Sequence, residues 1–274
     1  DFCLSRGLGD VYKRQFLFFG GFALATALNV QKIDKMISNK IMQLAKGRLF
    51  VAVLYLFLAT AFLSMWMSNT ATAAMMIPLS MTILSQLDQK EEHNTYVFVL
   101  LGIAYSATIG GMGTLVGSPP NAIAASQLHL DFADWLMYGT PVMLILFPLI
   151  IGWLYLVFKP KLGLHFAAEF EKIHMTKQRV LTLVIFITVA ILWIFGGYLN
   201  PIISQSLGLP KPIGSFDSMV ALSAAIVICV TGIASWKQVQ ENTEWGVLFL
   251  FGGGLTLSSV LTPVSYTHLT LPTI

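Results

Sequence analysis

Charged side chains are scarce in this sequence. Asp, Glu, Lys and Arg make up 11% of its 274 residues, whereas about 25% is usual in a soluble domain. Apolar residues make up 56%, and the mean hydropathy is +0.75. A soluble fold cannot bury that much apolar surface, so the composition predicts an all-α polytopic membrane protein. The net charge of +3 is concentrated in loops and gives no indication of nucleic-acid binding.

Cysteine is scarcer still, because the sequence contains Cys3 and Cys229 alone. Cys3 lies in a terminal stretch that we interpret below as foreign to the protein, which leaves one thiol in an apolar stretch. We therefore expect neither a disulfide nor a zinc site. Four histidines sit in or beside loops, and no cluster of His, Cys and carboxylates falls within an apolar stretch: His93, His129, His165 and His174. This pattern argues against an enzyme and against a bound cofactor.

Six apolar stretches carry no charged residue, and most are long enough to span a membrane. About 20 helical residues cross ~30 Å of hydrocarbon. The stretches are residues 49–87, 96–130, 135–158, 180–199, 218–236 and 245–263.

The two ends read as translated sequencing adapter. Residues 10–15 (DVYKRQ) can be encoded by GATGTGTATAAGAGACAG, and the reverse complement of that sequence reads through residues 264–268 (VSYTH). We therefore expect residues 1–15 and 264–274 to be artefacts and the natural protein to continue beyond both ends. A soluble basic arm at the N-terminus is the alternative.

Basic loops predict the orientation of the spans. Residues 29–48 hold five basic side chains against one acidic, and residues 159–179 hold five against two. Both segments are expected in the cytoplasm by the positive-inside rule. The first segment also has apolar residues at helical spacing, which predicts an amphipathic helix on the lipid surface. Those residues are Ile33, Met36, Ile37, Ile41 and Leu44.

The stretch 49–87 is interrupted by a short polar sequence, Ser-Asn-Thr-Ala-Thr at 68–72. Two apolar limbs that meet at a polar turn without a spacer predict a re-entrant hairpin whose tip stops inside the membrane. Ser64 lies four residues before Ser68, so we expect both on one helical face. The alternative interpretation is that Ser68 or Asn69 merely caps the second limb.

The stretch 96–130 is interrupted in its middle. Ser118 before Pro119 predicts a fresh helix start, where free N–H groups and the helix dipole favour an anion. Such a broken helix is typical of the central site of a transporter; a plain kinked helix is the alternative. The spacing of the glycines does not fit a dinucleotide-binding loop. The residues that support the break are Gly110, Gly111, Gly113, Thr114, Pro119, Pro120 and Asn121.

Residues 16–24 (FLFFGGFAL) resemble residues 248–256 (LFLFGGGLT), 232 positions later. Counting the spans makes the two copies antiparallel, which predicts an inverted-topology repeat. The first repeat would occupy residues 16–158, and residues 159–263 would be a cytoplasmic linker and the start of the second repeat. A counterpart of Asn69 would then fall near position 301, outside this truncated chain.

The apolar stretches contain no Lys or Arg to neutralise a buried dianion and no Asp or Glu to carry protons. An unpaired buried charge is very costly, so a bound cation together with helix termini is the remaining way to hold such an anion. This favours coupling to sodium over coupling to protons.

The hairpin motif, the broken helix and the Phe-Leu-Phe-Gly-Gly repeat together resemble the divalent anion:sodium symporter family, which includes bacterial dicarboxylate carriers and sodium:sulfate symporter-like proteins. The resemblance implies a homodimer in the bacterial inner membrane that works by an elevator movement. It also implies sodium binding by Ser64, Ser68, Asn69 and Gly117, and substrate binding by Asn69, Thr70 and Ser118. Ser118 stands where many members have Thr, which leaves the size of the substrate open.

The predicted function is sodium-coupled uptake of a small divalent anion, in particular a C4-dicarboxylate such as succinate. A sodium-independent citrate or dicarboxylate antiporter and a sulfate carrier of the same architecture are alternatives. A membrane subunit without transport activity is an alternative of another class, and it would tolerate changes at Asn69 and Gly117. We expect that this chain alone does not transport, because half of the anion's ligands would be missing.

Overall fold

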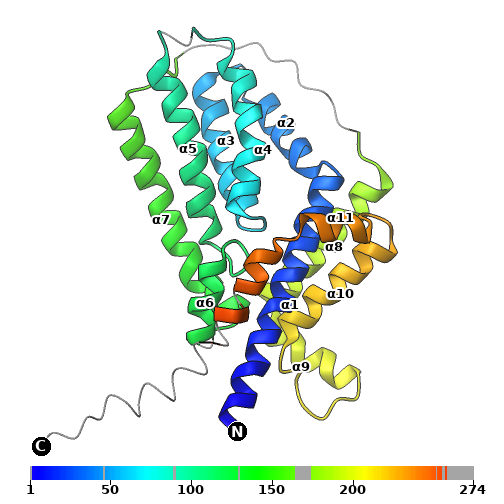
Figure 1. The fold of residues 1–274 in the computed structure, drawn as a ribbon. Helices are drawn as coiled ribbons and strands as arrows, with labels where there is room; N and C mark the ends of the chain where they lie inside the picture. The colour runs from blue at the N-terminus through cyan, green and yellow to red at the C-terminus, as the bar shows by residue number, and fades with distance from the viewer. Residues whose placement is uncertain are drawn as a thin grey trace, which may run out of the picture.

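The computed structural model describes residues 2–45, 47–88, 91–128, 130–163, 174–250, 252–254 and 257. This part of the chain is helical and contains no strand, which confirms the all-α prediction (Figure 1). Its helices are α1 (Phe2–Val30), α2 (Ile33–Leu44), α3 (Leu49–Ser64), α4 (Asn69–Leu84), α5 (His93–Gly111), α6 (Pro119–Gln127), α7 (Phe132–Phe158), α8 (Lys177–Ile194), α9 (Gly196–Ser206), α10 (Phe216–Val230) and α11 (Trp236–Asn242).

The helices form two groups that pack side by side (Figure 1). We call α3 to α7 the hairpin unit, and α1 with α8 to α11 the frame. Helix α2 follows α1 of the frame and packs against α3 of the hairpin unit, so it joins the two groups. Its prediction as a helix with one apolar face is consistent with its burial, since Ile33 is fully buried, although Leu44 at its other end is 58% exposed.

The core of the hairpin unit lies between α3, α4, α5 and α7. Phe57 of α3 packs edge-on against Phe98 of α5, with ring centroids 5.5 Å apart. Gly102 of α5 lies directly beneath the Phe57 ring, where any Cβ atom would collide with it. The Tyr96 hydroxyl donates to the carbonyl oxygen of Leu84, 2.5 Å away, and so fastens α5 to the end of α4. Both limbs of the hairpin are thus held against α5.

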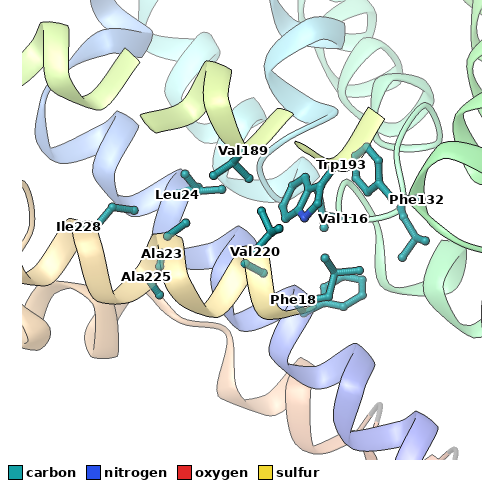
Figure 2. Close-up of a cluster of buried hydrophobic side chains, with 14 of the residues drawn as sticks. Phe18, Ala23, Leu24, Val116, Phe132, Val189, Trp193, Val220, Ala225 and Ile228 are labelled. Atoms are coloured by element: carbon teal, nitrogen blue, oxygen red, sulfur yellow. The ribbon is translucent and has the colours of Figure 1, made fainter. Parts of the chain in front are cut away.

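The core of the frame lies between α1, α8 and α10, and it extends to the broken segment after α5, to Ala122 and Ala125 of α6 and to Phe132 of α7. Figure 2 shows Ala23 and Leu24 of α1 facing Val220, Ala225 and Ile228 of α10. Small residues let these two helices approach closely, as is common between membrane helices.

Within the described part of the chain, three helices are long and apolar enough to cross a membrane: α5, α7 and α8. The limbs α3 and α4 have 16 residues each, or about 24 Å of helix, which is short of the ~30 Å hydrocarbon core. Helix α7, with 27 residues, reaches about 40 Å. The hairpin turn therefore lies beside the middle of the unit, not at its end (Figure 1). This is the geometry expected of a re-entrant hairpin.

The two basic segments lie at the same end of the molecule. Lys161, just after α7, forms an ion pair of 2.9 Å with Glu92 before α5, and this hydrogen bond and charge raise the pKa of Lys161 above its ordinary value. Arg179 at the start of α8 donates from Nε to the carbonyl oxygen of Gln31 at the end of α1, 2.9 Å away. The contact between Arg179 and Gln31 joins the two basic segments, as expected if both lie on the same side of the membrane.

Two predicted spans end earlier than expected. The stretch 180–199 breaks at Phe195, because α8 ends at Ile194 and α9 starts at Gly196. Asn200 then closes a turn through its side chain, with 2.9 Å bonds to both the N–H and the C=O of Ile213. The stretch 218–236 ends at Val230, where Gly232 takes a positive φ of 69° that favours glycine. Both breaks fall within apolar stretches, so composition alone does not predict them.

The predicted repeat is described only in part. The second copy, 248–256, and the stretch 245–263 extend outside the described residues. Where the segments meet, they run antiparallel: Gln15 Nε2 donates to the carbonyl oxygen of Leu248 at 3.0 Å, and the Phe19 ring lies 6.1 Å from that of Trp245. Residues 264–274 lie outside the described part, and the adapter and repeat boundaries stay predictions.

Candidate functional site at the hairpin turn and the broken helix

The hairpin turn joins α3 and α4 through four residues. Helix α3 ends at Ser64 and α4 begins at Asn69. Ser68 is the N-cap of α4, and its side chain accepts a hydrogen bond of 3.3 Å from the N–H of Ala71. The expectation that Ser64 and Ser68 share a helical face is therefore wrong, because the helix ends before it reaches Ser68. Ser68 has the extended backbone conformation of an N-cap residue, so α3 cannot continue through it.

Ser64 contacts Asn69 across the turn instead. Ser64 Oγ lies 2.7 Å from Asn69 Oδ1 and 2.6 Å from the carbonyl oxygen of Ala107 in α5. A hydroxyl has one proton to donate. When that proton is donated to Ala107, the lone pairs of Ser64 Oγ and Asn69 Oδ1 face each other. A small cation bound by both oxygens would relieve that repulsion, and Ser64 is fully buried from water.

The break after α5 extends from Met112 to Ser118, and α6 begins at Pro119 as the sequence predicts. The last carbonyl groups of a helix have no partner within it. Here side chains supply the partners. Asn121 Nδ2 donates to the carbonyl oxygens of Gly111 and Thr114 at 2.7 Å each. In α7, Trp135 Nε1 donates to the carbonyl oxygen of Met112 at 3.1 Å, and Thr140 Oγ1 donates to that of Gly113 at 3.2 Å. The break is thus a fixed structure.

Sequence reasoning missed Trp135 and Thr140, although both hold the broken segment. Each is a polar group within the first turns of an apolar helix, and a polar group buried in a membrane protein must find a partner. That rule could have singled them out, but it does not say which carbonyl they reach. Gly139 lies between them on α7, and its ideal Cβ position is 2.7 Å from the carbonyl oxygen of Met112. Helix α7 therefore packs directly against the break.

The turn and the break contact each other. Thr114 Oγ1 donates to the carbonyl oxygen of Met65 in the hairpin turn, and the N–H of Gly117 donates back to Thr114 Oγ1 at 3.2 Å. Thr114 is fully buried. One threonine thus joins the end of α3 to the segment that precedes α6.

Oxygen atoms from both interruptions converge beside Gly111 and Gly117. A Cβ atom on Gly111 would collide with Asn69 Oδ1 and lie 3.0 Å from the carbonyl oxygen of Gly117. A Cβ atom on Gly117 would lie 2.6 Å from the carbonyl oxygen of Gly111 and 2.9 Å from that of Ser64. The carbonyl oxygen of Gly111 also accepts the hydrogen bond from Asn121 Nδ2. Oxygen donors are the ligands that hard cations prefer, and sodium binding here stays a prediction. Glycine is needed at both positions by the close approach.

The starts of α4 and α6 flank this group of oxygens. Asn69 is the first residue of α4, and Pro119 is the first of α6. Their N-termini carry the positive ends of two helix dipoles, which favour an anion. Thr70 is exposed and Ser118 is half-buried, so both predicted substrate-binding residues lie at the more open side of the turn and the break. Whether they bind substrate stays a prediction.

Comparison with known proteins identifies relatives among transporters. A family model described as "Citrate transporter" (CitMHS) matches residues 7–268. An uncharacterized transporter of Haemophilus influenzae is 72% identical over 246 residues, which cover 90% of this chain and 53% of that protein. An uncharacterized transporter of Methanocaldococcus jannaschii is 37% identical over 86% of this chain and 51% of that protein.

A third relative carries a functional name. The sodium-dependent dicarboxylate transporter SdcS of Staphylococcus aureus is 31% identical over 283 residues, which cover 89% of this chain and 51% of that protein. The chain spans about half the length of the curated relatives it matches. These matches confirm the resemblance to sodium-coupled anion carriers at the level of the family, and the family consists of transporters, not enzymes. The chain belongs to the citrate transporter family of multi-pass membrane proteins.

Proposed function

We propose that the full-length protein takes up a small divalent anion, coupled to sodium, across the bacterial inner membrane. The observation that carries the proposal is the convergence of Ser64 Oγ, Asn69 Oδ1 and the carbonyl oxygens of Gly111 and Gly117 between two helix starts. Oxygens suit Na⁺, and helix N-termini suit a carboxylate. Na⁺ is a transported substrate in this scheme, and no cofactor is needed.

Asn69 has the chemistry to couple the two substrates. Its side-chain amide offers a carbonyl oxygen and an NH₂ group. Oδ1 already lies 2.7 Å from Ser64 Oγ and faces the cation side, so the NH₂ group is left to reach an anion carboxylate. A cation that fixes the amide would also orient its NH₂ group. Sodium binding would thereby raise the affinity for the anion.

Succinate and citrate are the two anions to compare first. The SdcS relative is named for dicarboxylates, and the family model is named for citrate. We propose a C4-dicarboxylate such as succinate as the preferred substrate, carried by an elevator-type movement of the hairpin unit within a homodimer embedded in lipid.

The experiment needs a complete carrier. Residues 16–263 are joined to the second half of the Haemophilus influenzae relative, and the purified protein is reconstituted into vesicles. Uptake of labelled succinate, citrate and sulfate is measured with an inward gradient of Na⁺ and with K⁺ in its place. The proposal predicts that a Na⁺ gradient drives uptake of succinate. Equal uptake in K⁺ would favour a sodium-independent antiporter, and no uptake of any anion would favour a subunit without transport.

Asn69→Ala in this carrier is the sharpest variant. We expect sodium-dependent uptake to collapse while the protein still folds, because the loss of one hydrogen bond costs only about 1 kcal/mol. Asn94→Ala is the matched control, since Asn94 is an exposed asparagine at the start of α5. Unchanged sodium-dependent binding of succinate to the Asn69 variant, together with a lower melting temperature, would show that Asn69 has only a structural role.

A further inference from the structure

One carboxylate of the frame binds the hairpin unit. Asp217, in the first turn of α10, accepts a hydrogen bond of 3.2 Å at Oδ2 from the N–H of Phe132, the first residue of α7. Helix α7 already has its own capping box, formed by Asp131 and Asp134. The bond to Asp217 is therefore additional, and it joins two helices that belong to different groups. A hydrogen bond to a carboxylate is among the stronger kinds in proteins.

Trp66 of the hairpin turn joins the two groups a second time. Its ring centroid lies 4.9 Å from that of Phe186 and 6.5 Å from that of Trp193, both in α8 of the frame. It also stacks on Phe132 at 6.2 Å. Figure 2 shows Trp193 and Phe132 beside one another, with ring centroids 4.8 Å apart. The hairpin turn is thus inserted into an aromatic cluster of the frame.

Trp193 connects the aromatic cluster with the carboxylate. Its Nε1 donates to the backbone carbonyl oxygen of Asp217 at 3.0 Å. Trp193 is only 1% exposed and Phe132 is fully buried. The contacts form a closed ring, from Trp66 to Trp193, to Asp217, to Phe132 and back to Trp66.

The Trp66 N–H makes this contact costly to keep. Trp66 Nε1 is buried and finds no hydrogen-bond partner among the described residues. A buried donor without a partner is unfavourable, and it regains a hydrogen bond wherever water or another acceptor reaches it. The ring contacts stabilise the turn against the frame, whereas the buried N–H without a partner destabilises the same arrangement. An element whose two arrangements are close in free energy can populate both of them.

We propose that Trp66 and Asp217 are positioning residues that latch the hairpin unit to the frame in this conformation, and that their release is a step of the transport cycle. The inference rests on the proposed function, because it assumes that the hairpin unit moves against the frame. Trp66 lies in the hairpin turn, two residues before the Ser68 cap, so the latch and the predicted cation-binding residues share one turn.

A disulfide across the interface reports the latched state. The ideal Cβ position on Gly21 of α1 lies 3.5 Å from the Cβ atom of Val116 in the broken segment, which is within the range for a disulfide. The pair Gly21→Cys and Val116→Cys is introduced into the 274-residue chain after Cys3→Ser and Cys229→Ser. The rate of cross-linking by a mild oxidant is then measured in lipid nanodiscs.

The latch predicts that Trp66→Phe and Asp217→Asn each slow cross-linking, Asp217→Asn by about tenfold, which corresponds to about 1.4 kcal/mol. Asp134→Asn and Trp153→Phe are the matched controls. Asp134 caps the same helix from within it, and Trp153 is 64% exposed on α7. Both controls should cross-link at the parent rate. Phe186→Leu tests the same cluster from the frame should Trp66→Phe fail to fold.

Equal cross-linking rates in the parent, Trp66→Phe, Phe186→Leu and Asp217→Asn would overturn the latch. This readout needs no transported anion, so it is independent of the proposed function. Slower cross-linking in a protein whose completed carrier shows no sodium-driven uptake would support the latch and refute the proposed function. In the completed carrier, the latch further predicts that Trp66→Phe changes the maximal uptake rate per folded carrier more than the KM for the anion, whereas a merely structural role would change only the amount of folded carrier.

Discussion

The two interruptions of the hairpin unit are built differently, although they lie against each other. The turn between α3 and α4 contains no glycine, and two local contacts close it, the Ser68 cap and the contact between Ser64 and Asn69. Ala107 and Thr114 then fasten the closed turn to α5 and to the break. The break between α5 and α6 is closed from a distance, by donors from α6 and α7. Its glycines leave space for the oxygens of the turn. The cap of the turn can be recognised from its own sequence, whereas the α7 donors that close the break lie up to 27 positions away.

This difference predicts where the unit is most easily broken. A substitution in the turn removes one contact of a side chain that solvent or a similar residue can replace. A substitution in the break forces backbone atoms apart or leaves buried carbonyl groups without donors. We therefore expect the largest effects in the break and the smallest at the cap of the turn.

Gly117→Ala should have the largest effect. The new Cβ atom would lie 2.6 Å from the carbonyl oxygen of Gly111 and 2.9 Å from that of Ser64, and both are backbone atoms that cannot turn aside. We expect a loss of about 3 kcal/mol in stability and no uptake by the completed carrier. Thermal unfolding in detergent measures the first effect, and vesicle uptake measures the second.

Gly152→Ala is the control for that variant, because nothing lies within 4 Å of its ideal Cβ position on α7. Alanine is the better helix former by about 1 kcal/mol, so this change should leave stability equal or raised. A Gly117 variant as stable as the Gly152 variant would show that the break is loosely packed.

Asn121→Ala should have the second largest effect. Asn121 is 7% exposed, and its Nδ2 group serves the carbonyl oxygens of Gly111 and Thr114 at 2.7 Å each. Truncation leaves both acceptors buried without this donor, which costs about 2 kcal/mol. Asn121→Asp keeps the shape but offers no donor, so it should be at least as harmful. If Asn121→Asp is as stable as the parent, the two hydrogen bonds do not hold the break.

Much of the hairpin unit could be predicted from its residues. The Ser-Pro pair at 118–119 predicts the start of α6 at Pro119, as observed, whereas α4 begins at Asn69, inside the polar sequence 68–72 that was expected as the turn, in line with the alternative of a cap there. Both signals are local, because capping side chains and proline act on the residues next to them. The prediction that Ser64 and Ser68 share a helical face was wrong, because helical periodicity does not extend past the end of a helix and α3 ends at Ser64.

The frame was harder to predict, because its breaks are set by contacts between distant residues. Asn200 forms its pair of bonds with Ile213, thirteen residues later, and no local pattern indicates that partner. The contact of Trp66 with Trp193 joins residues that are far apart in the sequence. The oxygens of the site show the same limit: composition indicates which groups can bind a cation, but only the fold brings Ser64, Asn69 and Gly117 together.

Ser68→Ala should have the smallest effect on stability and is the test of the turn itself. The Ser68 side chain accepts one hydrogen bond of 3.3 Å, from the N–H of Ala71, and loss of such a cap costs about 1 kcal/mol, or roughly 2–4 °C in melting temperature. Ser235→Ala is the matched control, since Ser235 caps α11 in the frame in the same way, far along the chain from the turn. We expect both variants to melt slightly earlier.

The two variants should differ in their response to sodium. If Ser68 also binds Na⁺, Ser68→Ala lowers the affinity for sodium in the completed carrier, whereas Ser235→Ala does not. Ser68→Thr keeps both the cap and the hydroxyl oxygen, so it should restore the melting temperature and the sodium dependence together. A Ser68→Ala carrier with the parent's sodium affinity would show that the residue acts as a cap alone. The cation would then be held by Ser64, Asn69 and the carbonyl oxygens of the break, and the second interruption would supply more of the site than the first.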